Sequence, residues 1–382
     1  MSVAEEIKDK ASDLTEMLEL RLAAQQGYVR SQFTLAVKLA KGEGVSKDLD
    51  EAVKWYEKAA KKGFGPAQNN LGLILAGNDY SAPDSSEALR WFRKAADSGY
   101  GPAQWNLARH LQVGEGVDQS LSESIEWVRK VAEQEMAAAQ NRLGVCCSEG
   151  IGMEVDEVQA VGWFRKAAEQ GLAAGQYNLG IRLRDGRGTG SEPELAHELF
   201  GKAAEGGVMG AQFALAQMLV VDEGSGKPDE PQVTHWYRKA AEQGHVEAQN
   251  ILGQRLVEGV GSPVDLVEAL QWFALAAEKG CVLAQYRYGR HLLQGDGVTV
   301  NGRTAVHWLR LAAVAGNLDA QFLLADAFDS GLVLERDPEE AIKWFGKAAQ
   351  GGKAAAQFIL AVSLENGEGC QRDIEEAVKW YD

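Results

Sequence analysis

Cysteine is scarce in this sequence: its 382 residues contain Cys146, Cys147, Cys281 and Cys370 and no others. Four thiols are too few for a disulfide framework, and the adjacent pair is poorly placed to bridge itself. Long apolar runs are missing too, because stretches such as 71–76 fall far short of the roughly 18 residues that span a bilayer. The N-terminus has neither a basic start nor an apolar core, so no signal peptide is visible. We therefore expect a cytoplasmic protein without membrane insertion.

Basic residues are in the minority. The chain has 39 Lys and Arg against 55 Asp and Glu, which gives a net charge of −16 at pH 7. Binding of nucleic acid needs clustered Lys and Arg that neutralise phosphates, so we expect no nucleic acid partner. The same balance argues against docking on an anionic membrane surface. Hydrophobic residues make up 45% and charged residues 25% of the chain, which is typical of a folded protein.

Motifs for catalysis and metal binding are missing as well. The sequence contains no H-E-x-x-H, C-x-x-C or G-x-S-x-G, and its six His do not cluster at metal-ligand spacing. The Gly-rich segment 186–190 joins two expected helices rather than a strand and a helix, and Lys227 is followed by Pro, which does not fit a P-loop. We therefore expect no catalytic residue, no cofactor and no metal.

What the chain does contain is a repeat of 36 residues. Nine of its ten Trp residues keep this register, at positions 55, 91, 127, 163, 236, 272, 308, 344 and 380. The interval between Trp163 and Trp236 covers two units, one with Leu199 in place of Trp and one with an extra residue near 224–228. Random placement would not produce this spacing.

A second marker repeats with the same period. Eight units carry an Ala-Gln pair, as at 67–68, and nine open with a Gly four residues before it, as at Gly63. With the opening residue as position 0, ten units start at 27, 63, 99, 135, 171, 207, 244, 280, 316 and 352. Residues 1–26 are expected to form an N-terminal capping helix. The last unit stops within its second helix, so we expect it to be truncated.

Each unit contains two amphipathic segments. Apolar or small residues fall at +4, +8 and +12, and then at +25, +28, +32 and +33, which is helical spacing in both segments. Gly residues near +15 and +17 are expected to end the first helix. One unit cannot bury both stripes, so units must stack. We expect the Trp at +28 to fill the core, and replacement of Trp163 or Trp272 by Ala to cost about 3–5 kcal/mol.

The repeat pattern can be written as A-Q-x-x-L-G, then G-x-G-V, then A-x-x-W-[YF]-x-K-A-A-x-x-G, as in 67–72, 42–45 and 52–63. It resembles the Sel-1-like repeat (SLR) family, relatives of the tetratricopeptide repeats. The resemblance covers residues 27–382. It implies an all-α fold, an α-solenoid that forms a right-handed superhelix of ten helix–loop–helix repeats with a concave face.

The candidate binding surface is the face of each first helix opposite its core, at +6, +10 and +13, which lines the concave groove in tetratricopeptide relatives. Position +6 is aromatic in seven units and Asn in three, and charges at +10 and +13 are irregular. The candidate partner-binding residues are Trp105, Arg109, Tyr177, Arg184, Phe213, Tyr286, Arg290, Phe322, Asp326 and Asp329. The aromatic residues fit two interpretations, packing against the next unit or contact with a partner, and the sequence leaves both open.

Two classes of function are compatible with these features. The first is a non-catalytic protein–protein interaction scaffold or adaptor that binds a peptide or partner domain on its concave face. Its Arg residues favour a ligand with acidic groups, while Asp326 and Asp329 favour a mixed-charge one. The second, implied by the resemblance, is a β-lactamase-like hydrolase or the repeat region of a larger, kinase-linked enzyme. Hydrolase-like members resemble a Cys-rich type with a disulfide in each repeat, which this chain lacks, so we favour the scaffold.

Overall fold

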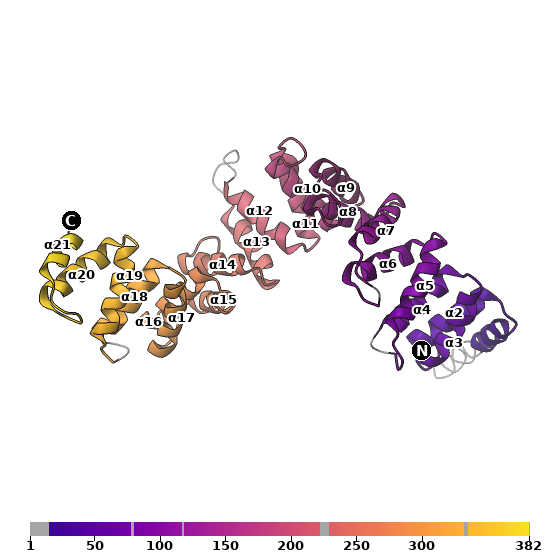
Figure 1. Cartoon of the computed structure of the whole chain (residues 1–382), viewed down its shortest axis with the longest axis horizontal. Coiled ribbons are helices and arrows are strands. Elements are labelled where there is room, and N and C mark those ends of the chain that lie inside the picture. The colour runs from indigo at the N-terminus through magenta and orange to yellow at the C-terminus, as the bar shows by residue number, and fades with distance from the viewer. Residues whose placement is uncertain (1–14, 78–79, 117, 222–228, 332–334, 382) are drawn as a thin grey trace. The chain divides into compact units, whose positions relative to one another are not determined.

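The structure is a computed structural model that describes residues 15–77, 80–116, 118–221, 229–331 and 335–381. Every regular element in these ranges is a helix, and the helices follow one another in antiparallel-type pairs joined by short loops (Figure 1). From α2 to α10, and again from α12 to α21, each helix packs mainly on the helices before and after it in the chain. This arrangement confirms the predicted all-α solenoid.

The first helices of the units begin two residues after each opening position. They are α2 (Val29–Lys41), α4 (Gly65–Ala76), α6 (Gly101–Val113), α8 (Ala137–Glu149), α10 (Ala173–Asp185), α12 (Met209–Val221), α14 (Val246–Glu258), α16 (Val282–Gln294), α18 (Leu318–Ser330) and α20 (Ala354–Asn366). The second helices carry the periodic Trp. They are α3 (Leu49–Lys61), α5 (Ser85–Asp97), α7 (Leu121–Glu133), α9 (Glu157–Glu169), α11 (Pro193–Glu205), α13 (Glu230–Glu242), α15 (Leu266–Glu278), α17 (Gly302–Val314), α19 (Pro338–Gln350) and α21 (Ile374–Tyr381).

Residue chemistry sets the helix ends. Except for α11, which follows Glu192, second helices begin after an Asp, Ser or Asn whose side chain accepts a hydrogen bond from a backbone N–H of the first turn, as Asp265 does from Glu268 at 2.9 Å. Most of the described first helices end at a Gly in the left-handed backbone region, as predicted, and Gly259 closes α14 with a φ of 71°, whereas α4 ends at Gly77 with a φ of −85°. Glu135 replaces the opening Gly of the fourth unit and keeps the same left-handed backbone, with a φ of 63°.

The centre of the core lies at position +29, one residue after the periodic Trp. The largest fully buried side chains include five Phe residues at this position, namely Phe92, Phe164, Phe200, Phe273 and Phe345. The prediction that the Trp residues fill the core is confirmed for Trp55, Trp91, Trp127 and Trp344, which are buried, but not for the other Trp residues of the register. Trp163 and Trp272 are only half-buried, and even the most buried Trp residues of the register keep 5–8% of their surface exposed.

The Trp ring lies at the rim of the core because its N–H needs a hydrogen-bond acceptor. Trp272 Nε1 donates to Glu268 Oε1 at 3.0 Å, one helical turn earlier on α15. On α9 the Lys166 ammonium lies 4.2 Å from the centroid of the Trp163 ring, a cation–π contact. Both partners are charged groups that remain near water, so these two half-buried Trp residues mark the edge of a core whose centre is the following residue.

Glycine at position +9 of the first helix makes room for the side chain at +29. A Cβ atom added at Gly253 would lie 2.6 Å from the Phe273 ring, and one added at Gly144 would lie 2.6 Å from the Phe164 ring. Such approaches are too close for carbon atoms, so these helix pairs need the missing side chain to pack at their observed separation.

The Gln of the Ala-Gln pair links one unit to the next. Gln249 is buried, and its Nε2 donates to the backbone carbonyl oxygen of Ala241 at 3.1 Å. The same bond, at 2.9–3.2 Å, is made by Gln32, Gln68, Gln104, Gln140, Gln212, Gln285, Gln321 and Gln357. The pair that served as a sequence marker is thus a contact between consecutive units.

We expect Gln249→Leu to lower the free energy of unfolding by about 1–2 kcal/mol, because it removes a buried hydrogen bond while keeping most of the side-chain volume. Urea unfolding followed by circular dichroism measures the change. Gln271→Leu, at an exposed position on α15, is the control and should stay within about 0.5 kcal/mol of the parent. Equal effects of the two substitutions would contradict the bridging role.

Charged contacts also link consecutive second helices. An Arg at +30 reaches the Glu at +24 of the following unit, as Arg93 Nη1 reaches Glu123 Oε1 at 2.8 Å. Arg238 and Glu268 make the equivalent contact later in the chain. The same Glu residues accept from the Trp N–H groups, so each one connects its own helix to the preceding unit.

Residues 15–25 are helical and lie where the N-terminal cap was predicted. Arg21 Nη1 contacts Glu51 Oε1 at 2.6 Å. This contact is equivalent to the one that the Arg at +30 of a second helix makes with the Glu at +24 of the following unit. The hydrogen bond from Arg21 holds the pKa of the Glu51 carboxyl below its usual value. The rest of the predicted cap, residues 1–14, lies outside the described residues.

The chain divides into two compact units, residues 1–199 and 200–382, and each is described by itself below. Within the second, the core forms clusters of apolar residues around Phe273 and around Phe345. Among the described helices, none is both long and apolar enough to cross a membrane.

Candidate functional site

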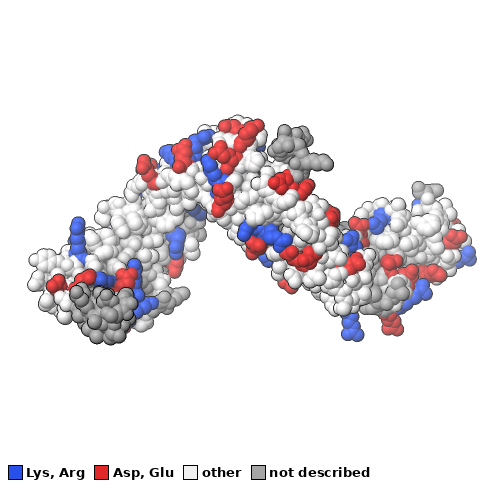
Figure 2. Space-filling model, turned by 180° about the vertical axis from the view of Figure 1, so that it is seen from behind, with Lys and Arg blue, Asp and Glu red and all other residues white. Residues whose placement is uncertain are grey.

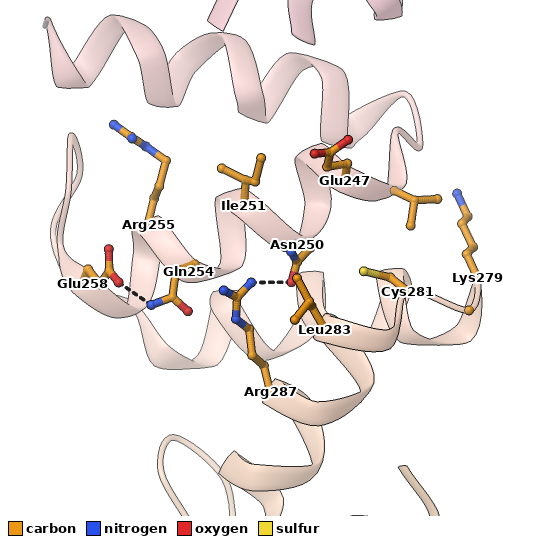
Figure 3. A pocket seen from close by; sticks show the side chains of 12 residues that line it. Glu247, Asn250, Ile251, Gln254, Arg255, Glu258, Lys279, Cys281, Leu283 and Arg287 are labelled. Carbon is orange, nitrogen blue, oxygen red and sulfur yellow. Dashed lines mark hydrogen bonds between the residues drawn. The ribbon is translucent and has the colours of Figure 1, made fainter. Parts of the chain in front are cut away.

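In residues 200–382, the first helices α14 and α16 border a groove with a volume of about 850 Å³ (Figure 3). This volume lies within the range typical of ligand-binding clefts. The groove is lined by Val246, Glu247, Asn250, Ile251, Gln254, Arg255, Glu258, Lys279, Gly280, Cys281, Leu283 and Arg287. It is therefore made of the outer faces of two consecutive first helices and of the turn that leads into α16.

Helical periodicity explains why these side chains face outward. On α14, Leu252 and Leu256 are buried in the core, whereas Gln254 and Ile251 are half-exposed, although Ile251 also packs against the edge of the core. On α16, Leu283 is 49% exposed although it is a large apolar residue. Ile251 and Leu283 give the groove an apolar floor, and polar side chains surround it (Figure 3).

Arg287 reaches across the groove from α16 to α14. Its Nη1 donates to Asn250 Oδ1 at 2.6 Å (Figure 3). Among the described residues, no carboxylate lies within ion-pair distance of Arg287, and burial lowers the pKa of its guanidinium. The groove therefore presents a half-buried cation whose other N–H donors have no anionic partner.

Three of the four other charged side chains of the groove are already engaged, whereas the exposed Glu247 takes part in no ion pair or hydrogen bond among the described residues. Arg255 is paired with the Glu230 carboxylate and donates to the Thr234 hydroxyl at 2.8 Å. Lys279 donates to the Gly244 carbonyl oxygen at 3.0 Å, and Glu258 accepts from the Gln254 amide. The resulting surface has mixed charge. On the described part of the face drawn in Figure 2, Lys and Arg are likewise interspersed with Asp and Glu.

Two of the predicted aromatic residues in this part pack within the solenoid. The Phe213 ring is stacked on His245 at 4.1 Å between centroids and meets Tyr237 edge-on at 5.8 Å. The Phe322 ring meets Phe345 edge-on at 5.5 Å. These contacts support the packing interpretation of position +6, although both rings remain half-exposed.

The other candidates of residues 200–382 lie on α16 and α18. The Arg290 guanidinium lies 5.8 Å from the centroid of the Tyr286 ring, so these two predicted residues do come together. Asp329 is paired with Arg336 at 3.2 Å. Partial burial, and then the nearby Asp329, raise the pKa of the Asp326 carboxyl.

In residues 1–199, Trp105 and Arg109 lie on α6 and border one small cavity together, as their spacing predicted. Tyr177 is half-buried on α10, and Arg184 at the end of that helix is exposed and contacts Asp185 at 2.8 Å. Partner binding by all ten candidates stays a prediction.

The α14–α16 groove was missed because none of the ten predicted residues lines it. Prediction used +6, +10 and +13 of a single helix, whereas the groove also uses +3 and +7 of the next one, as in Leu283 and Arg287. A signal did exist. Each Asn at +6 is followed, one unit later, by a polar residue at +7, and the structure joins these in pairs: Asn69–Asn106, Asn141–Asn178 and Asn250–Arg287.

The described residues contain no group of three or more His, Cys, Asp or Glu placed to hold a metal ion. His110 and His291 are buried and pack against the core rings of Phe92 and Phe273, with centroids 5.2 and 6.0 Å apart. Burial lowers the pKa of His291. These two residues therefore act as core side chains.

Stacked helical hairpins that bury an Ala-rich seam define a repeat solenoid. Comparison with family models finds ten consecutive Sel1 repeats, at residues 29–64, 65–100, 101–136, 137–172, 173–208, 210–245, 246–281, 282–317, 318–353 and 354–382. The chain therefore belongs to the Sel1 repeat family, whose members generally serve as scaffolds for protein interactions.

Two solved structures are similar over most of the chain. One is a protective antigen present in uropathogenic Escherichia coli strains and displaying an SLR fold, with 34% identity, a TM-score of 0.78, and coverage of 95% of this chain and 78% of that one. The other is a Sel1 repeat protein from Oxalobacter formigenes, with 32% identity, a TM-score of 0.63, and coverage of 83% and 92%. A comparison with curated proteins finds no significant match.

Proposed function

We propose that this chain is a non-catalytic scaffold that binds a peptide or partner domain along its first helices, with the α14–α16 groove as one contact site. The observation that carries the proposal is the juxtaposition of exposed Leu283 with Arg287, a half-buried cation that has no carboxylate partner among the described residues. An apolar floor beside an unpaired guanidinium is suited to a partner side chain that supplies both burial and charge.

The size and composition of the groove also support protein binding. Its volume of about 850 Å³ is large enough for several side chains of an extended segment. Its apolar and charged groups alternate, which matches a peptide surface better than a uniformly charged polymer. The scaffold role is also the one that Sel1 repeat proteins generally have.

We expect Leu283→Asp to weaken partner binding roughly 10- to 100-fold, because a buried Leu contributes about 1.5–3 kcal/mol and the new carboxylate would be desolvated. The purified chain, immobilised, would be used to capture proteins from a lysate of its own host, with quantification by mass spectrometry. Leu275→Asp is the matched control. Leu275 is also exposed, at 42%, but lies on the second helix α15 and outside the groove.

Circular dichroism must show that both variants keep the helical content of the parent. Selective loss of partners with Leu283→Asp would support the groove, whereas equal retention by both variants would contradict it. Turnover of a β-lactam by the purified chain would contradict the scaffold role and favour the hydrolase alternative.

A further inference from the structure

Residues 1–199 carry a second cavity on the first-helix face. It has a volume of about 150 Å³ and is bordered by Trp105, Ala108, Arg109, Gln112, Val128 and Arg142. These residues come from α6, α7 and α8, so the cavity lies between two consecutive first helices and the second helix that joins them. A cavity of this volume accepts a group about as large as benzene, which is the size of one side chain.

The sequence explains why a cavity forms at this unit. In four other units an aromatic residue at +6 meets another aromatic residue at +29, as Phe213 meets Tyr237. In the unit of Tyr286 the residue at +29 is the larger aliphatic Leu309. Here the +6 residue is Trp105, but +29 is the much smaller Val128. The volume that a second ring would occupy is therefore left open beside Trp105, and Arg142 of the next unit borders it.

Two guanidinium groups border the cavity without any acidic residue among its lining side chains. Within the described residues, neither Arg109 nor Arg142 takes part in an ion pair or a side-chain hydrogen bond. Other Arg residues within 1–199 do find carboxylates: Arg93 contacts Glu123, and Arg182 contacts Glu157 at 3.6 Å. In a chain of net charge −16, an acid-free pocket with two cations is an exception that an anionic group would complement.

We infer that the Trp105–Arg109–Arg142 pocket binds a Glu or Asp side chain from an extended segment of a partner protein. The inference rests on the proposed function and specifies the chemistry that one part of the first-helix face recognises. The carboxylate accepts charge-assisted hydrogen bonds from the two guanidinium groups, which match its planar geometry. The aliphatic part of the bound residue, or its apolar neighbour, lies on the indole of Trp105. Trp and Arg are the residue types that most often carry binding energy at interfaces.

A carboxylate fits this pocket better than a phosphate group. Arg109 and Gln112 lie in the last turn and a half of α6, near the negative end of the helix dipole. That end disfavours a dianion more than a monoanion. The pocket is also lined by side chains from the middle and end of the bordering helices, so it lacks the helix N-terminal N–H groups that typically hold phosphate.

The test uses a display library of random dodecapeptides, selected against the full chain. We expect the selected peptides to be enriched in an acidic residue next to an apolar one. The affinity of a selected peptide, measured by fluorescence anisotropy, should fall about thirtyfold with Arg109→Gln combined with Arg142→Gln, which is the typical effect of losing a binding hot spot. Arg129→Gln, at an exposed position on α7, is the control and should leave the affinity unchanged.

A mutant cycle identifies the contact. Replacing the acidic residue of the peptide by its amide should weaken binding to the parent about thirtyfold but should have little further effect on the double Arg variant. Peptides selected without acidic enrichment, or an amide substitution that weakens binding equally to both proteins, would overturn the inference and leave the proposed scaffold function standing. Tighter binding of a phosphoserine version would overturn the assignment to a carboxylate. If the parent selects no peptide at all, the peptide-binding scaffold fails together with the inference.

Discussion

Replacing Phe273 by Ala is expected to lower the free energy of unfolding by about 3–5 kcal/mol, because it leaves a cavity at the centre of a fully packed unit. The adjacent Trp272→Ala is expected to cost less, about 1–2 kcal/mol, because the indole is half-buried and its loss leaves a gap that water can enter. The order of these two losses of stability is the reverse of the one expected from the Trp periodicity, which suggests that Trp272 is the main core residue. Urea unfolding followed by circular dichroism compares the two variants.

Hydrogen exchange gives a second measure of the same prediction. In a linear array the loss of stability should be largest in the damaged unit and its neighbours, so amides of residues 244–280 should exchange faster in the Phe273 variant. If Trp272→Ala proves as costly as Phe273→Ala, position +28 belongs to the core and the assignment of +29 as its centre is wrong.

Gly261→Ala is expected to cost about 2–5 kcal/mol, and Gly280→Ala only about 1–2 kcal/mol. Both Gly residues have a left-handed backbone, with φ of 71° and 86°, so a side chain strains either position by a similar amount. At Gly261 the new Cβ would also overlap with the backbone carbonyl oxygen of Glu230 and with the Thr234 hydroxyl. At Gly280 no atom lies within 4 Å of the new Cβ.

Thermal and urea unfolding of both Gly variants isolate the steric part of the effect. The Thr234 hydroxyl donates to the Val260 carbonyl oxygen at 3.0 Å, so displacement of this loop would also remove a contact with the preceding unit. Equal destabilisation by the two substitutions would mean that backbone strain alone causes the loss of stability, and that the close approach at Gly261 makes no contribution to it.

The repeat could be predicted because its signals are local. These signals are Gly at the helix ends, Ala on the inner faces and the 36-residue Trp period, and each depends only on residues that are close in the chain. The structure confirms the helices that they predict. The exact centre of the core could not be predicted in this way. Position +29 is Phe in five units, Tyr in three, and Val128 or Leu309 in the other two, so it is a weaker marker than Trp, although Phe at this position is more deeply buried. The handedness implied by the family resemblance stays a prediction.

The binding surface was predictable only in part, because it depends on contacts between units. The helix wheel placed Trp105 and Arg109 together correctly, but it could not add Arg142, which comes from the next unit. The wheel missed Arg287 for the same reason, because Arg287 belongs to the unit after that of Asn250. A single-helix wheel also could not show that Phe213 is covered by His245 at the start of the following repeat. Pairing +6 of one unit with +7 of the next is the rule that would have recovered both sites.

The side-chain pairs at unit boundaries have a consequence for the order of the repeats. The Gln bridge is the same at nearly every boundary, so it places no restriction on which unit follows which. The +6/+7 pairs do. An in-frame deletion of residues 280–315 would bring Leu323 opposite Asn250, so that the amide of Asn250 would face an apolar side chain. A deletion of residues 99–134 would instead bring Arg142 opposite Asn69. That pair would recreate the Asn–Arg combination of Asn250 and Arg287. Some deletions of one repeat therefore preserve matched neighbours while others do not, and this limits how such an array can shorten or recombine during its evolution.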